Sequence, residues 1–217
     1  MILSRGRRYL FIHIPKTGGT SMALALEARA MKDDIMLGDT PKALRRRGQL
    51  RGAQAAGRLW KHSTLADLDG VVAQDELDAL FIFTLVRNPW DRVVSYYHWL
   101  RGQSFDHPAV GLAKTLSFEA FVFHPTIAAS FAATPAASYV TDAEGAVRAT
   151  HYIRLEHLAH DLLPLQAHLG LELEIPHINQ SARATGYQRA YSEASRAQVA
   201  KLCAQDIDQF GYVFGDQ

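Results

Sequence analysis

Cysteine and long apolar runs are both scarce in this sequence. Cys203 is the one cysteine among 217 residues, so no disulfide can form within the chain. This excludes a secreted scaffold held by internal disulfides and favours a reducing compartment. The apolar stretch 9–14, which follows a basic start, is too short for a signal sequence or a membrane-spanning helix. We therefore expect a soluble, cytoplasmic protein with no membrane span.

A large excess of charge of one sign is also lacking. Charged residues make up 21% of the chain, and the formal net charge is only +1. Nucleic-acid-binding domains are usually strongly basic, so we expect no nucleic-acid partner. The chain is 48% hydrophobic, which suits one globular domain over residues 1–217. A domain of this length buries roughly 70% of the surface of its unfolded chain.

The pattern of apolar residues predicts an α/β fold. Short, nearly continuous apolar runs are typical of buried parallel strands, and they occur at 9–14 and 80–86. A third strand is expected at 151–155. Helical patterns follow them at 20–30, 90–101, 158–169 and 192–210. We expect Thr20 or Ser21 to cap the first helix and Gly170 to end the third. Strands alternating with helices favour a parallel sheet with helices on both faces.

The first chemical motif lies where the first predicted strand meets the first predicted helix. Glycines let backbone N–H groups converge on an anion, and a helix N-terminus adds further donors and a favourable dipole. A lysine adds a full positive charge, and three hydroxyl side chains add polar contacts. Because the lysine precedes the glycines, this is not a Walker A loop. The residues that could hold a phosphate-like group are Lys16, Thr17, Gly18, Gly19, Thr20 and Ser21.

The second motif follows the second predicted strand. Arg87 comes directly after that strand, at the sheet edge where ligands of open α/β sheets gather. Ser95 lies about two turns into the following helix. A guanidinium fork and a hydroxyl suit a phosphate monoester. Asp91 and Arg92 are expected to pair with neighbours and brace the turn, and Trp90 fits either packing or contact with a base ring.

The string Pro15-Lys-Thr-Gly-Gly-Thr-Ser21, followed by Arg87 to Ser95, resembles the donor-binding motifs of sulfotransferases that use 3′-phosphoadenosine 5′-phosphosulfate (PAPS). It resembles especially the carbohydrate branch that includes heparan sulfate 2-O-sulfotransferase. The resemblance implies a P-loop-NTPase-like fold and transfer of a sulfuryl group from PAPS to an acceptor hydroxyl, with 3′-phosphoadenosine 5′-phosphate (PAP) released. It implies that the Lys16–Ser21 loop binds the 5′-phosphosulfate and that Arg87 and Ser95 bind the 3′-phosphate.

The resemblance also implies a catalytic pair. Lys16 stabilises the leaving oxygen, and His62, in a segment similar to the family's candidate histidine segment, takes the acceptor's proton. Arg183 and Arg189 lie where these enzymes place a loop over the nucleotide, so we assign them to the donor or to an acceptor phosphate. A solvated basic loop is an equal alternative for these two arginines. No metal is expected, because no Cys/His cluster has zinc spacing.

Two other functions stay open from the sequence. An ATP-dependent small-molecule kinase would need a Walker-type lysine and a magnesium-binding acid, and neither is evident. A non-catalytic nucleotide-binding module would keep the fold and transfer nothing. The acceptor is a small molecule or a glycan, and the oligomeric state is not indicated.

Overall fold

The computed structural model describes residues 1–176 and 186–216. Contacts within the chain divide it into two compact units. Unit 1 comprises Met1–Val86 and Ala136–Ile178, and unit 2 comprises Arg87–Pro135 and Asn179–Gln217. The loop at Lys16 and the candidate base His62 therefore belong to unit 1, whereas Arg87 and Ser95 belong to unit 2. The expectation of one domain over residues 1–217 stays a prediction.

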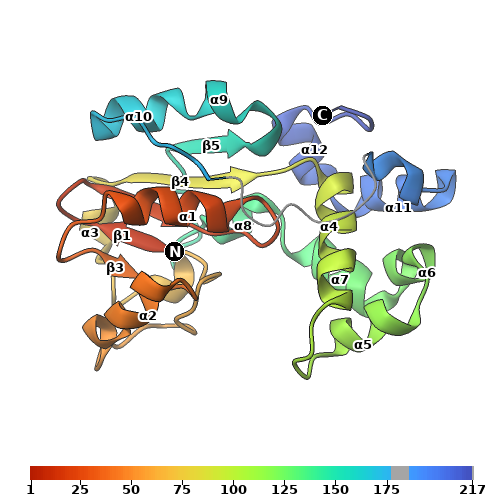
Figure 1. Ribbon diagram of the computed structural model, residues 1–217, viewed down its shortest axis with the longest axis horizontal. Helices are drawn as coiled ribbons and strands as arrows, with labels where there is room; N and C mark the ends of the chain where they lie inside the picture. The colour runs from red at the N-terminus through yellow and green to blue at the C-terminus, as the bar shows by residue number, and fades with distance from the viewer. Residues whose placement is uncertain (177–185, 217) are drawn as a thin grey trace. The chain divides into compact units, whose positions relative to one another are not determined.

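Unit 1 contains a five-stranded mixed sheet (Figure 1). The strand order is β3-β1-β2-β4-β5. The strands are β1 (Ile2–Ser4), β2 (Tyr9–Ile12), β3 (Ile35–Met36), β4 (Phe81–Val86) and β5 (His151–Arg154). The three predicted strands are confirmed as β2, β4 and β5. They pair in parallel, and Leu10 lies opposite Ile82 in that register.

The prediction of a wholly parallel sheet is wrong at one edge. Strand β1 pairs antiparallel with both β2 and β3. A tight turn causes the reversal, because the Arg8 N–H donates to the Arg5 carbonyl at 3.2 Å and Arg8 has a φ of 52°. The returning chain then places Ser4 opposite Tyr9. Strands of two or three residues give no clear period, so the sequence did not reveal β1 or β3.

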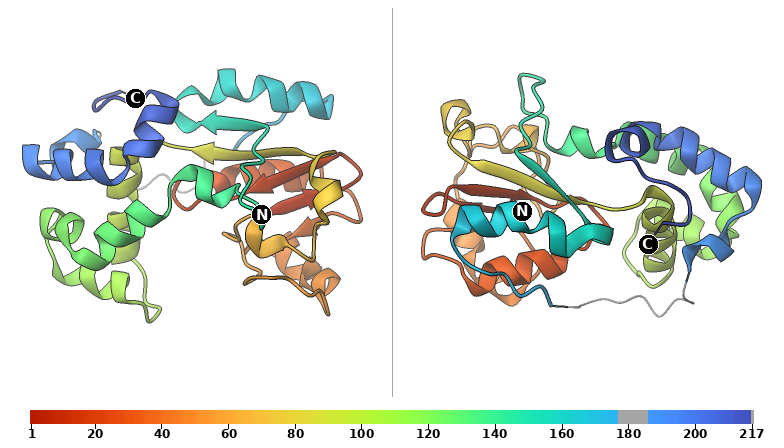
Figure 2. Two further views of the ribbon diagram at one scale, coloured as in Figure 1. Left: turned by 180° about the vertical axis from the view of Figure 1, so that it is seen from behind. Right: turned by 90° about the horizontal axis from the view of Figure 1, so that it is seen from above.

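Helices flank this sheet, and the α/β fold class is confirmed. Helices α1, α9 and α10 lie on the same face of the sheet, as the view from above shows (Figure 2). The segment with α8 lies on the far face, where the Leu65 N–H donates to the Tyr139 carbonyl at 2.8 Å. The helices of unit 1 are α1 (Gly19–Ala28), α2 (Pro41–Arg46), η1 (Arg47–Leu50), η2 (Ala66–Leu68), α3 (Gln74–Leu77), α8 (Ala136–Tyr139), η3 (Leu155–His157), α9 (Leu158–Asp161) and α10 (Leu163–Leu169).

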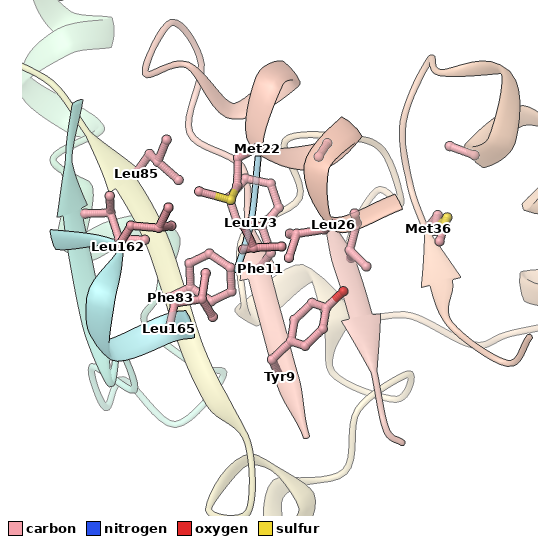
Figure 3. Close-up of a cluster of buried hydrophobic side chains, with 14 residues drawn as sticks. Tyr9, Phe11, Met22, Leu26, Met36, Phe83, Leu85, Leu162, Leu165 and Leu173 are labelled. Atoms are coloured by element: carbon pink, nitrogen blue, oxygen red, sulfur yellow. The ribbon is translucent and has the colours of Figure 1, made fainter. Parts of the chain in front are cut away.

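A buried apolar cluster fixes α1 to the sheet (Figure 3). Alternate residues of the strands, among them Phe11 and Phe83, point to one face, as the period of two requires. Their rings stack with centroids 5.2 Å apart. Met22 and Leu26 of α1 stand four residues apart and reach down onto these rings. This packing sets the position of the turn between β2 and α1.

The third predicted helix, 158–169, is interrupted. It forms α9 and α10 with a break at Leu162, because Pro164 has no N–H to continue the hydrogen-bond ladder. Gly170 ends α10 with a φ of 64°, as predicted.

Unit 2 is helical. Its core contains Tyr97, Leu100, Val110 and Phe121, and the Tyr97 hydroxyl donates to the Leu116 carbonyl at 2.8 Å. The predicted helix 192–210 is two helices that meet at Cys203. The helices of unit 2 are α4 (Pro89–Arg101), α5 (Pro108–Thr115), α6 (Phe118–Phe123), α7 (Pro125–Ala133), η4 (Tyr187–Ala190), α11 (Glu193–Leu202) and α12 (Ala204–Phe210).

Candidate functional site

The turn between β2 and α1 has the backbone of an anion-binding loop. Lys16 has a φ of 67°, which is rare for a residue with a Cβ and costs about 1 kcal/mol or more. Gly18 has a φ of 87° and is the N-cap of α1. The expectation that Thr20 or Ser21 caps this helix is wrong, because the left-handed turn at Gly18 starts the helix earlier. Strain of this kind is typical of functional loops.

Both glycines of the loop are enclosed by side chains. A Cβ on Gly18 would stand 2.8 Å from Cδ1 of Leu155, and a Cβ on Gly19 would stand 2.0 Å from Cδ2 of His13. Both distances are too short for real carbon atoms. The loop therefore needs glycine at position 19 for space, and at position 18 chiefly for its φ, because the terminal methyl group of Leu155 can shift.

The hydroxyl side chains of the loop differ in their surroundings. Thr17 is buried, and its hydroxyl donates to the Ile14 carbonyl at 2.9 Å, so it closes the turn. Thr20 is exposed and Ser21 is partly buried in the first turn of α1. The first turn, Gly19 to Met22, carries no acidic side chain that would oppose an anion. Its N-terminal dipole and the charge of Lys16 thus favour a phosphate-like group.

His62 is held beside this loop by the backbone of His13. Nδ1 of His62 lies 2.7 Å from the His13 carbonyl oxygen, which can only accept a hydrogen bond. Nδ1 therefore carries the proton of the neutral ring, and Nε2 keeps its lone pair. The two imidazoles meet edge to face, with centroids 4.5 Å apart. Because the His13 ring also lies against Gly19, the candidate base and the phosphate loop share one neighbour.

Burial keeps His62 neutral. Desolvation lowers its pKa to about 4, a decrease that the bond to the His13 carbonyl partly offsets. Burial lowers the pKa of His13 well below its usual value, and the neighbouring His62 lowers it further. At neutral pH, His62 therefore has the charge state that a general base needs.

Residues that precede His62 in the chain lie near its ring. Lys61 pairs with Asp39 at 2.6 Å, and this pair holds the pKa of the Asp39 carboxyl below its usual range. The Trp60 indole meets the His62 ring edge-on at 5.0 Å and is itself 40% exposed. The guanidinium of Arg58 lies over the Trp60 ring, 5.0 Å from its centroid.

In unit 2, Arg87 is oriented by the helix that follows it. Nε of Arg87 donates to Oδ2 of Asp91 at 2.8 Å, and a terminal nitrogen donates to the same oxygen. The expected bracing role of Asp91 is thus present. The helix itself is fixed by Asn88, whose side chain accepts from the Trp90 N–H at 3.2 Å. These two hydrogen bonds to Asp91 hold the Arg87 guanidinium in one orientation.

Ser95 and its neighbours on α4 are buried. Ser95 is 6% exposed and lies two turns after the start of the helix. Arg92 lies 4.0 Å from Asp206, which agrees with its expected structural role. Trp90 is buried, donates to the Arg196 carbonyl at 3.0 Å and contacts the ring of Phe214. Packing is therefore the role that the structure gives to Trp90.

Comparison with known families now decides the class of protein. The model of the sulfotransferase family matches residues 1–213. The chain belongs to the sulfotransferase family. Comparisons with curated proteins and with solved structures give no match. The family match supports an enzyme that transfers a sulfuryl group, which agrees with the expectation from the two motifs.

Two predicted site residues of this sulfotransferase lie near its C-terminal part. Arg183 falls outside the described residues. Arg189 lies in η4 and is exposed. In residues 1–176 and 186–216, no group of three or more His, Cys, Asp or Glu side chains is placed to hold a metal ion. Over the same described part, none of the helices has the length and apolar character needed to cross a membrane.

Sequence reasoning missed the role of His13 in this sulfotransferase. His13 is buried, with 7% of its surface exposed. Its carbonyl bond to His62 links residues 49 positions apart, so no local pattern reveals it. Sequence reasoning also missed Asp161, which pairs with Arg154 at 2.8 Å and 3.0 Å.

Proposed function

We propose that this sulfotransferase moves a sulfuryl group from PAPS to an acceptor hydroxyl and releases PAP. The observation that carries the proposal is that His13 contacts both parts of the site: its carbonyl accepts a hydrogen bond from Nδ1 of His62, and its ring lies against Gly19 of the loop. A neutral base beside an anion-binding loop is the arrangement that an in-line transfer to a hydroxyl requires. A module that only bound nucleotide would have no need of such a base.

On the donor side, the loop residues match the chemistry of a phosphosulfate. The backbone N–H groups at the start of α1 and the ammonium of Lys16 offer positive charge without a competing carboxylate in the first helical turn. When the bond between sulfur and the bridging oxygen breaks, that oxygen keeps the electron pair. Lys16 stabilises the negative charge that develops there.

On the acceptor side, His62 removes the proton. The acceptor oxygen forms its bond to sulfur while its proton passes to Nε2 of His62, the nitrogen that carries the lone pair. The new positive charge then rests on an imidazolium that donates from Nδ1 to the His13 carbonyl. A pKa of about 4 makes His62 a weak base in the free protein. An anionic donor beside the ring favours its protonated form.

The 3′-phosphate distinguishes PAPS from ATP, and we assign it to Arg87 and Ser95. Support comes from the orientation of Arg87 by Asp91 and from the positions of the two residues, with Arg87 just before α4 and Ser95 two turns into it. We further propose a carbohydrate hydroxyl as acceptor, by resemblance to the heparan sulfate 2-O-sulfotransferase branch. Arg183 and Arg189 stay assigned to donor or acceptor phosphate under this proposal.

Calorimetric titration with PAP, ADP and AMP tests the proposal directly. PAP is expected to bind tightly and the other two nucleotides weakly, because only PAP carries a 3′-phosphate. Equal affinity for all three, or no binding, would remove the support for PAPS as donor. Turnover that required both ATP and magnesium would favour a kinase instead. Binding of PAP without transfer to any of a broad acceptor panel would favour a non-catalytic module.

A further inference from the structure

His13 lies at the junction of the anion-binding loop and the candidate base. It follows β2 directly and is 7% exposed. The inner face of its ring stacks on Phe11, with centroids 5.8 Å apart and planes at 19°. Core packing thus holds the ring from one side, and the ring has little freedom to move.

On the loop side, the His13 ring occupies the space that any larger residue than Gly19 would need. A Cβ at Gly19 would stand 2.0 Å from Cδ2, 2.3 Å from Nε2 and 2.8 Å from Cγ of His13. Gly19 is the first residue of α1, where an anion would meet the helix N-terminus. The ring therefore lies directly against the backbone of the loop.

On the base side, the same residue makes two contacts with His62. Its carbonyl oxygen lies 2.7 Å from Nδ1, and its ring meets the His62 ring edge-on at 4.5 Å. The carbonyl contact selects the tautomer, and the ring contact sets the tilt of the imidazole. Both are lost or altered if His13 shifts.

We propose that His13 is a positioning residue that couples the anion-binding loop to His62, so that the backbone at Gly19 and the orientation of the base are set together. The inference rests on the proposed function for the role of His62 as base. Movement of the loop at Gly19 presses on the His13 ring, and the ring transmits the displacement to His62. Packed interiors transmit such strain because they hold few voids.

The charged and titratable groups that act on His62 come from four segments. They are His13 after β2, Lys61 beside His62 with its partner Asp39, and the amino group of Met1 at the start of β1. None of these groups belongs to α1. A change at Gly19 that alters the titration of His62 must therefore act through packing, and His13 is the residue that touches both.

The test compares Gly19→Ala with Gly18→Ala by NMR of the histidine rings. The new Cβ at position 19 meets His13, whereas the new Cβ at position 18 meets Leu155. We expect Gly19→Ala to shift the pKa and the Nδ1–H tautomer signal of His62, and Gly18→Ala to leave both as in wild type. An unchanged His62 in Gly19→Ala, or an equal shift in both variants, would overturn the proposal. The measurement needs no donor, so it remains informative if PAP fails to bind and the proposed function falls.

Two variants of His13 itself complete the test. His13→Ala opens a cavity beside His62, admits water and is expected to raise the His62 pKa toward its usual value near 6.5. Turnover falls by about 100-fold, the scale of a misplaced catalytic group. His13→Phe keeps a ring in place and is expected to restore both properties in large part. Leu10→Ala, a comparable truncation of a fully buried residue on β2, is the control and should lower stability alone. If His13→Ala only lowers stability, as the control does, the role is structural and the proposal fails.

Discussion

At the scale of single residues, the loop combines strain with charge. Lys16 holds a left-handed backbone that asparagine or glycine would adopt at lower cost. A lysine at such a position is understandable if its ammonium is needed there. The cost in stability is then offset by a function in binding or transfer.

Replacing Lys16 with alanine tests this role of the charge. Alanine bears the same backbone cost, so stability should change little while the charge is lost. We expect turnover to fall by about 100-fold or more, as when a group that stabilises a transition-state oxyanion is removed. Lys32→Ala, which removes an exposed lysine of unit 1, is the control. Steady-state kinetics with near-normal kcat in Lys16→Ala would contradict the leaving-group assignment.

The depressed pKa of His62 predicts how stability depends on pH. Between pH 6.5 and about 4, the unfolded chain binds a proton at this residue and the folded chain does not. Unfolding is therefore favoured as the pH falls through this window, and the stability contribution is fully present above it. Urea unfolding at several pH values should show this loss in wild type and a smaller loss in His62→Gln. If the free energy of unfolding changed equally with pH in both proteins, the pKa of His62 would not be lowered in the folded state.

At the scale of elements, α1 depends on how its first residues are enclosed. Gly18→Ala is expected to destabilise the fold by about 1–2 kcal/mol for the left-handed backbone alone. The clash with Leu155 adds to that cost and should weaken PAP binding. Gly170 also has a left-handed φ, but a Cβ there meets nothing within 4 Å. Gly170→Ala is thus the control for backbone strain without a clash, measured by urea unfolding and calorimetry. An equal loss of stability and unchanged PAP affinity would contradict the prediction.

The sequence predicted elements well where packing and local chemistry agree. Strands β2 and β4 are continuous apolar runs, and α1 and α4 follow glycine and Asn88-Pro89 signals that act locally. Prediction from the sequence failed where a long-range contact determines whether an element forms or where it ends. Strand β1 is defined by its pairing with β2 and β3, and the break at Cys203 interrupts an otherwise helical pattern.

In the candidate site too, features set by local sequence were predictable and features set by long-range contacts were not. The positions of Lys16 and Arg87 at strand-to-helix turns follow from local sequence. The bond that orients His62 joins residues 49 positions apart and depends on the loop 57–62 passing β2. The resemblance suggests His62 as the base, but only the structure shows its neighbour His13 and the hydrogen bond that fixes its tautomer.

At the scale of the whole molecule, the residues assigned to the donor are divided between the two units. The loop that we assign to the phosphosulfate belongs to unit 1, and Arg87 with Ser95 belongs to unit 2. If the loop binds the phosphosulfate and Arg87 with Ser95 binds the 3′-phosphate, each unit contributes separately to the affinity for the donor. Changes in one unit should then affect one end of the nucleotide.

Replacing Arg87 with lysine tests the contribution of unit 2. Lysine keeps the charge but loses the planar fork, so PAP affinity should fall by about tenfold, near 1.4 kcal/mol, the scale of a charge-assisted hydrogen bond. AMP lacks the 3′-phosphate, so its affinity should not change. Arg101→Lys, at the end of the same helix, is the control. Calorimetry that showed equal losses for PAP and AMP would place Arg87 away from the 3′-phosphate.

The order of the strands along the chain also bears on synthesis. Strands β4 and β5 are adjacent in the sheet, with Phe83 opposite His151, yet the whole of 87–135 is made between them. Closing so long a loop costs conformational entropy before the pairing of β4 with β5 contributes any stability. On the ribosome, the edge of β4 that later pairs with β5 stays unpaired until the first half of unit 2 has emerged. No single cut in the chain yields either unit complete, because each unit is built from two segments that are separated in the sequence.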